Sequence, residues 1–200
     1  MVNRRQFLSL TAATSVGVLL PACQKQSTPA LPVKDANGHY LWQNWSGSEH
    51  AYPTQRLAPN NIDELKQVIA AAPTPIRCVG AGHSFNGQCT TEGTLLALDN
   101  FSGLVGHNNL AYLATVKAGT RLQQLGKLLE DIGQDMVNIP DVNKQTLAGA
   151  IATGTHGSGL ELPALHGRVQ SFRLLTLQGQ EMNCSVNENA EIYHAALVGL

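Results

Sequence analysis

The chain has 200 residues, of which 43% are apolar, 14% charged and 5% aromatic, and it contains 19 glycines. Globular proteins average about 25% charged residues, so this chain is poor in charge, and its apolar content excludes a disordered acidic or basic tail. Lys and Arg total 13 against 14 Asp and Glu, and no basic run lies beyond the first few residues, which excludes a nucleic-acid-binding protein driven by bulk charge.

The N-terminal segment has the pattern of an export signal. Arg4 and Arg5 precede the uncharged stretch 8–20, which is shorter than the roughly 20 apolar residues that span a bilayer. Paired arginines before an apolar stretch resemble a bacterial twin-arginine (Tat) signal, with a general secretory signal as the alternative. Residues 1–22 are therefore expected to direct the protein to the Tat export machinery and to the periplasm or cell envelope.

A cysteine follows the apolar stretch directly. Cys23 comes after a small residue, as in a lipoprotein cleavage site, so we expect it to be acylated and to anchor the protein at the membrane surface. The polar segment 23–40 then reads as a tether. The remaining cysteines, Cys78, Cys89 and Cys184, match no C-x-x-C motif; buried free thiols are expected at Cys78 and Cys184, with a disulfide as the alternative.

Apolar residues at helical spacing predict two helices in the middle of the chain. The first begins after Asn61, which we expect to form a capping box with Glu64. The second begins after Thr120, with Gln123 as its capping partner, and ends at Gly133. Its buried stripe is expected to consist of Leu122, Leu125, Leu128, Leu129 and Ile132.

Short apolar runs predict strands, at 76–79, 94–98, 110–118 and 137–139. A hairpin is expected from 171–177 and 181–185, with Gly179 in its turn. Ser185 and Glu188 then form a second capping-box pattern before a helix that reaches Leu197. Helices and strands alternate irregularly, which indicates an α+β fold.

The first of two glycine-rich stretches, 79–87, follows a strand directly. Its glycines let the backbone approach a ligand closely, and successive N–H groups in such a turn can bind a pyrophosphate. Its spacing is not the G-x-G-x-x-G of a dinucleotide-binding Rossmann unit. An ordinary surface turn is the alternative.

The second glycine-rich stretch covers 140–159. Residues 145–152 are small and helical in pattern, which allows close approach by a neighbouring backbone or a flat ligand; tight helix packing is the alternative. Residues 153–159 add hydroxyl groups and bare backbone. Together the two stretches suggest one elongated polar ligand held by two loops.

Three blocks of the sequence, 79–86, 99–104 and 146–159, resemble the PCMH-type FAD-binding domain of the vanillyl-alcohol oxidase superfamily. The nearest branch contains the gulonolactone, arabinonolactone and alditol oxidases, and Asn44-Trp45-Ser46-Gly47 is similar to the opening of that branch. The resemblance implies an α+β domain over residues 41–200, in which two small subdomains flank the cofactor.

The resemblance also implies the binding residues. The histidine of the first block, His83, would be joined covalently to the 8α-methyl group of FAD, and its neighbours would wrap the pyrophosphate: Gly80, Ala81, Gly82, Ser84, Phe85 and Asn86. The second block would line the pyrophosphate, ribityl chain and ring through Asp141, Thr146, Gly149, Ala150, Thr153, Thr155, His156 and Gly157. His156 either contacts the flavin or braces its loop, and no histidine spacing indicates a metal site.

The branch oxidises an alcohol carbon of a sugar lactone or a polyol, with hydride passing to the flavin and electrons then to oxygen or another acceptor. In that family, the segment matching 192–200 continues toward a substrate domain, so we expect a truncated chain and name no catalytic acid or base. The alternatives are a flavin-binding lipoprotein without catalysis and a flavoenzyme similar to UDP-N-acetylenolpyruvoylglucosamine reductase. The latter class works in the cytoplasm, which the export signal disfavours. An adhesive lipoprotein without flavin is the remaining alternative.

Overall fold

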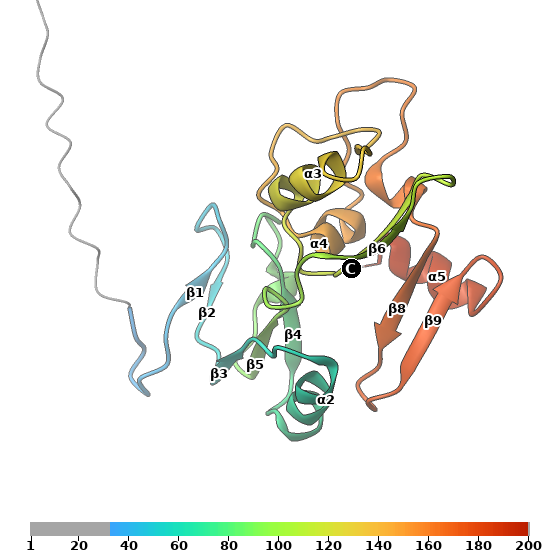
Figure 1. Cartoon of the computed structure of the whole chain (residues 1–200). Helices are drawn as coiled ribbons and strands as arrows, with labels where there is room; N and C mark the ends of the chain where they lie inside the picture. The colour runs from blue at the N-terminus through green and yellow to red at the C-terminus, as the bar shows by residue number, and fades with distance from the viewer. Residues whose placement is uncertain (1–32, 200) are drawn as a thin grey trace, which may run out of the picture. The chain divides into compact units, whose positions relative to one another are not determined.

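The computed structural model describes residues 33–199. The expected signal over 1–22, the acylation of Cys23 and the first part of the expected tether therefore lie outside the described residues. Residues 33–40 form a tight turn, closed by a bridge between Lys34 and Tyr40. Strands and helices then alternate irregularly along the chain, which confirms the α+β prediction (Figure 1).

A parallel sheet of three strands positions the first glycine-rich stretch. Its order is β3 (Gln55–Leu57), β5 (Thr94–Ala97) and β4 (Ile76–Val79), with Leu95 of β5 opposite Arg56 on one side and Arg77 on the other. The central strand is buried and the outer strands are largely not. A two-stranded antiparallel ladder of β1 (Trp42–Gln43) and β2 (His50–Ala51) precedes the sheet, and Trp42, Ala51 and Leu95 share a hydrophobic cluster.

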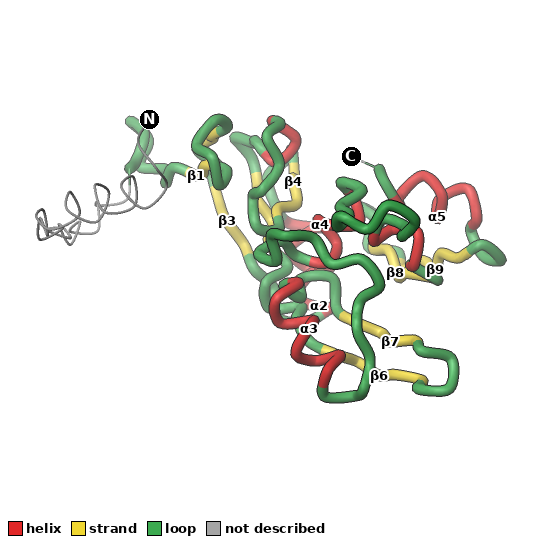
Figure 2. The backbone as a smooth tube through the Cα atoms, turned by 90° about the horizontal axis from the view of Figure 1, so that it is seen from above, coloured by secondary structure: helices red, strands yellow, loops and turns green. Residues whose placement is uncertain are grey.

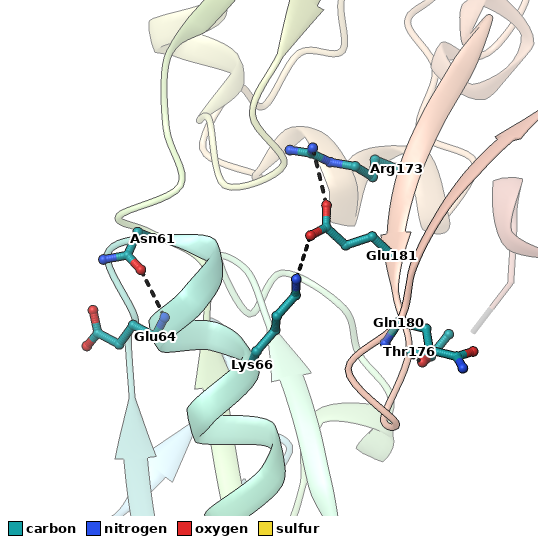
Figure 3. A network of polar contacts seen from close by, with 7 residues as sticks. All are labelled: Asn61, Glu64, Lys66, Arg173, Thr176, Gln180 and Glu181. Atoms are coloured by element: carbon teal, nitrogen blue, oxygen red, sulfur yellow. Dashed lines mark hydrogen bonds and ion pairs between the residues drawn. The ribbon is translucent and has the colours of Figure 1, made fainter.

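Helix α2 (Ile62–Ala71) connects β3 to β4 and begins as expected. The Asn61 side chain accepts a hydrogen bond from the Glu64 N–H at 2.9 Å (Figure 3). The reciprocal half of the capping box differs, because the Glu64 carboxylate accepts from the N–H of Asn60 at 2.9 Å instead. That hydrogen bond lowers the pKa of Glu64.

Helix α3 (Leu122–Glu130) has the predicted apolar stripe but a different start. Its buried leucines pack with Ala150 of α4 (Leu147–Ala152) in a second cluster. Thr120 does not cap the helix: its buried hydroxyl accepts from the Gly103 N–H at 2.9 Å and donates to the Lys117 carbonyl at 2.7 Å. A local capping pattern therefore gave way to a tertiary hydrogen bond. The helix ends at Glu130, and the left-handed conformation predicted for Gly133 is confirmed by its φ of +71°.

Two strand predictions are wrong. The expected strand 110–118 is only β7 (Leu113–Val116), which pairs with an unpredicted strand β6 (Leu104–Asn108) in a hairpin (Figure 2). The Asn108 side chain accepts from the N–H groups of Leu110 and Ala111, which turns the chain at that point. The expected strand 137–139 is absent, and the side chain of Asn138 within it is buried and donates to the Pro163 carbonyl.

The predicted C-terminal hairpin is confirmed as β8 (Ser171–Leu175) and β9 (Glu181–Ser185), with Gly179 at φ +77°. Helix α5 (Ala190–Leu197) begins later than its expected cap. Ser185 does accept a hydrogen bond from the Glu188 N–H at 3.1 Å, but in a turn before the helix, and the capping prediction is wrong. Tyr193 of α5 stacks on Phe172 of β8 with ring centroids 5.7 Å apart.

An ion-pair network joins α2 to the C-terminal hairpin (Figure 3). Lys66 Nζ lies 2.7 Å from Glu181 Oε1, and Arg173 Nη1 lies 3.2 Å from Glu181 Oε2. The hydrogen bond from Lys66 and the neighbouring positive charges lower the pKa of Glu181. The network thus links segments more than a hundred residues apart in sequence.

One of the two predictions of a buried cysteine is confirmed and the other is wrong. Cys184 is buried, as expected, whereas Cys78 is exposed on an outer strand, so the expectation of a buried thiol there is wrong. All of the cysteines between residues 33 and 199 are free thiols, Cys89 included. Among the described helices, none has the length and apolar character needed to cross a membrane.

Candidate functional site

The first glycine-rich loop leaves the carboxyl end of β4 and runs to the short 3-10 turn η1 (Gly87–Cys89). Two of its carbonyl groups are held from outside: the Trp45 N–H donates to the Gly82 carbonyl at 2.7 Å, and Asn44 Nδ2 donates to the Ser84 carbonyl at 2.9 Å. Within residues 33–199, the backbone N–H groups of 81–85 donate no hydrogen bond. Successive free N–H groups in a turn form an anion site.

Asn44 is the buried support of this loop. Its amide oxygen accepts from the Glu49 N–H at 3.1 Å while its amide nitrogen donates to Ser84 and to the Ser48 hydroxyl. Only 3% of the residue is exposed. A buried amide that loses such partners costs about 1–3 kcal/mol, so the loop is fixed by a residue that lies about 40 positions earlier in the chain.

The two glycine-rich stretches, which the sequence predicts to hold one ligand, contact each other directly. A Cβ at Gly80 would overlap the hydroxyl of Thr146. Thr146 in turn is the N-cap of α4, with the Gly149 N–H donating to its hydroxyl at 3.4 Å. The structure therefore brings Gly80, Thr146 and Gly149 together. Beside them, the buried side-chain oxygen of Gln145 accepts no hydrogen bond within residues 33–199.

A pocket of about 380 Å³ opens on the first loop. Its charged residues are Arg56, Asp99 and Arg121. Arg121 is engaged by Asp99 at 2.6 Å and by the Lys144 carbonyl at 3.1 Å, whereas Arg56 makes no ion pair within residues 33–199. The full lining is Leu41, Trp42, Gln43, Arg56, Gly80, Ala81, Gly82, Asp99 and Arg121. Bare backbone and an unneutralised guanidinium thus share one pocket.

His83 lies beside exposed aromatic rings. Its imidazole stacks on the indole of Trp45, with ring centroids 5.5 Å apart and an interplanar angle of 22°. Phe85 meets the same indole edge-on at 6.4 Å. Asn86 closes the loop by capping η1, since its side chain accepts from the Gln88 N–H.

The rest of the second stretch lies apart from this pocket, which none of its residues lines. Ala150 is completely buried in the core, and Asp141 lies in an exposed loop. The hydroxyl oxygens of Thr153 and Thr155 are 3.1 Å apart. Among these positions Ala150 lies in the core, whereas Asp141 and Thr153 are exposed.

His156 braces its own loop in the structure. Its Nδ1 lies 2.8 Å from the carbonyl oxygen of Gly157, to which the N–H donates. A Cβ at Gly157 would overlap the backbone of Ile139 and the side chain of Asn138. The glycine therefore serves a close approach between two loops. No group of metal-ligating side chains occurs in the part of the chain that the structure describes.

Sequence reasoning did not name several pocket residues. Asp99 lies two residues after the end of β5 in the parallel sheet, and the carboxyl ends of such strands commonly carry binding residues, so it could have been found. Arg56 lies in a strand of only three residues, and Arg121 lies in a predicted helix start. Neither has a local signal, because only the packing of β3 and α3 around the loop brings them together.

The donor set fits a dinucleotide pyrophosphate, which needs backbone amides that approach closely and a positive charge nearby. The family model described as an FAD binding domain matches residues 53–185. The chain belongs to this FAD-binding domain family. Its matched region includes both glycine-rich stretches and most of the pocket, apart from the β1 segment.

Curated relatives of this FAD-binding domain are aldonolactone oxidoreductases. It is 33% identical over 163 residues to an L-gulono-1,4-lactone dehydrogenase of Mycobacterium tuberculosis, covering 80% of this chain and 37% of the relative. It is 32% identical over 177 residues to a D-arabinono-1,4-lactone oxidase of Kluyveromyces lactis, covering 83% and 33%. The chain thus spans about a third of the length of these relatives.

The fold of this FAD-binding domain is similar to that of a solved carbohydrate oxidase from Microdochium nivale. The TM-score is 0.69 at 17% sequence identity, over 76% of this chain and 34% of that one. At this identity the likeness shows the fold. The expected PCMH-type α+β architecture is confirmed by both comparisons.

Proposed function

We propose that this chain binds FAD at the first glycine-rich loop and forms the cofactor-binding part of an oxidoreductase that acts on an alcohol carbon of a sugar lactone or polyol. The observation that carries the proposal is the row of free N–H groups at 81–85, next to a pocket that contains Arg56. The names of the curated relatives support a sugar lactone as the substrate.

In this proposal, the chain's own residues bind and orient. The loop amides and Arg56 hold the pyrophosphate, and the Gly80–Thr146 contact packs this loop against the start of the second glycine-rich stretch. FAD, when bound, accepts a hydride from the alcohol carbon and passes electrons to oxygen or another acceptor. Thr153, Thr155 and His156 are proposed to reach the ribityl chain and ring.

We assign covalent attachment of the flavin to His83. His83 would hold the flavin through a bond from a ring nitrogen to the 8α carbon, formed with loss of the imidazole N–H proton and one 8α hydrogen. Dioxygen would take up the two electrons and the two protons as hydrogen peroxide. Dioxygen is therefore the co-reactant that takes up the two electrons and two protons of the attachment.

The proposed location is the cell envelope. The twin-arginine pattern and Cys23 support Tat export followed by anchoring at the membrane surface. Tat carries folded proteins, which suits a domain that acquires its cofactor before export.

The experiment that tests cofactor binding is a titration of the purified chain with FAD, followed by denaturing electrophoresis. We expect quenching of flavin fluorescence on binding and a fluorescent protein band after denaturation. His83→Ala should bind FAD and lose the fluorescent band, while His107→Ala, on the exposed β6 strand, should keep it. Failure of the chain to bind FAD overturns the proposed function, and a fluorescent band in His83→Ala overturns the attachment site.

A further inference from the structure

The imidazole of His83 has a stacked aromatic neighbour. Within residues 33–199 neither of its ring nitrogens makes a hydrogen bond, so the stacked indole of Trp45 is its defined side-chain contact. The χ2 torsion of histidine has broad minima. Without the indole, the plane of this ring would be poorly fixed.

Trp45 is fixed in place by a hydrogen bond of its backbone rather than by burial of its side chain. Its N–H donates to the Gly82 carbonyl at 2.7 Å, one residue before His83, and the preceding Asn44 donates to Ser84, one residue after. These hydrogen bonds clamp the segment at 44–45 onto both sides of His83. Yet 69% of the tryptophan is exposed, so this large apolar side chain contributes little to the core.

Stacking constrains the imidazole in a particular way. An indole on one face, at 22° from parallel, restricts rotation of the ring without itself covering the ring edge. The lone pair of an imidazole nitrogen lies in the ring plane and points out from that edge. The contact therefore restricts the orientation of the imidazole without the indole blocking its ring nitrogens.

We infer that Trp45 is a positioning residue for His83, which fixes the imidazole plane so that a ring nitrogen meets the 8α carbon of the flavin. This inference rests on the proposed function, because it concerns the attachment step described there. The bond formed is N–C at 8α, and dioxygen takes up the two electrons that are released. Orientation of reacting groups supplies large rate factors, so loss of the indole acts on the rate of attachment.

The test compares the attachment rate with reversible binding. The chain is mixed with excess FAD in air, and the fluorescent band after denaturation is followed with time. Trp45→Ala should slow attachment by roughly ten- to hundredfold, and Trp45→Phe, which keeps a stacking ring, should restore most of the rate. The control Tyr40→Ala removes another exposed aromatic ring, one that contacts the Lys34 ammonium, and should leave the rate unchanged.

A second background separates positioning from binding. In His83→Ala, where no bond can form, adding Trp45→Ala should leave the affinity for FAD unchanged. A matching loss of affinity would make Trp45 a binding residue and overturn the inference. Equal attachment rates with and without the indole would overturn it as well.

A readout without flavin separates this inference from the proposed function. The imidazole C–H resonances of His83 should carry a ring-current shift from the indole, which Trp45→Ala removes. Loss of that shift together with slow attachment supports the inference. An unshifted resonance in the unsubstituted chain overturns it, whatever the flavin does. A shifted resonance with FAD binding but no covalent attachment overturns the attachment site and, with it, the inference, while leaving the proposed cofactor binding intact.

Discussion

Gly80 packs directly against Thr146, so that the loop after β4 and the start of α4 touch without room for a side chain. These residues belong to the two separate glycine-rich stretches of the sequence. Their contact places the cap of α4 next to the proposed pyrophosphate loop. Because of this contact, even the single methyl group of an alanine at position 80 should disturb the site.

Gly80→Ala tests this contact. The added Cβ would push the Thr146 hydroxyl away and weaken the cap of α4, and overpacking of this kind costs about 1–3 kcal/mol. We expect a lower free energy of unfolding in urea and weaker binding of FAD. Gly106→Ala is the control, because a Cβ there meets no atom within 4 Å. Equal behaviour of the two variants would contradict a tight Gly80–Thr146 contact.

Asn44→Asp tests the support of the loop. The substitution keeps the shape but replaces the donor to the Ser84 carbonyl with a carboxylate oxygen. Two facing acceptors in a buried place should lower the free energy of unfolding by about 1–3 kcal/mol and weaken FAD binding. Asn187→Asp, at an exposed position, should change neither quantity. Unaltered stability of Asn44→Asp would show that the amide does not hold the loop.

Arg56→Gln tests the positive charge of the pocket. Because Arg56 makes no ion pair within residues 33–199, its charge is free to act on a phosphate. We expect the affinity for FAD to fall and to become less dependent on salt. Arg77→Gln is the matched control, since both arginines face Leu95 in the sheet register but only Arg56 lines the pocket. The same loss in both variants would indicate a general charge effect.

The Glu181 network predicts a pH dependence of stability. The hydrogen bond from Lys66 lowers the folded-state pKa of Glu181 below its ordinary value of 4.5. A lowered pKa gives a contribution that is complete above the unfolded-state pKa and is lost as pH falls through the folded-state pKa. The stability difference between the unsubstituted chain and Glu181→Gln should therefore be constant at neutral pH and shrink as the pH falls below the ordinary pKa of 4.5.

The measurement is urea unfolding across that pH range. Glu188→Gln is the control, since Glu188 forms no ion pair between residues 33 and 199. Lys66→Met should remove most of the pH-dependent difference. A difference that grows as the pH falls would contradict the lowered pKa. High salt should reduce the effect in part, because the pair is partly exposed.

The sequence alone determined features that depend on neighbours along the chain. The Asn61 cap, the leucine stripe of α3, the positive φ of Gly133 and the hairpin around Gly179 followed from local spacing. The glycine-rich stretches and the family resemblance predicted an FAD-binding domain, which the family match confirms. The local predictions agree with the structure because backbone conformation and amphipathic burial depend on residues a few positions apart.

Only the tertiary structure decided which groups meet across long separations. Thr120 stands at a helix-cap position in the sequence, but its hydroxyl accepts a hydrogen bond from Gly103 instead. The side chain of Asn108 accepts from the N–H of Leu110 and turns the chain where the apolar pattern of 110–118 predicts a strand. Arg56 and the indole stacked on His83 carry no local signal for their places. Their positions follow from packing, in which buried polar groups must find partners wherever the fold supplies them.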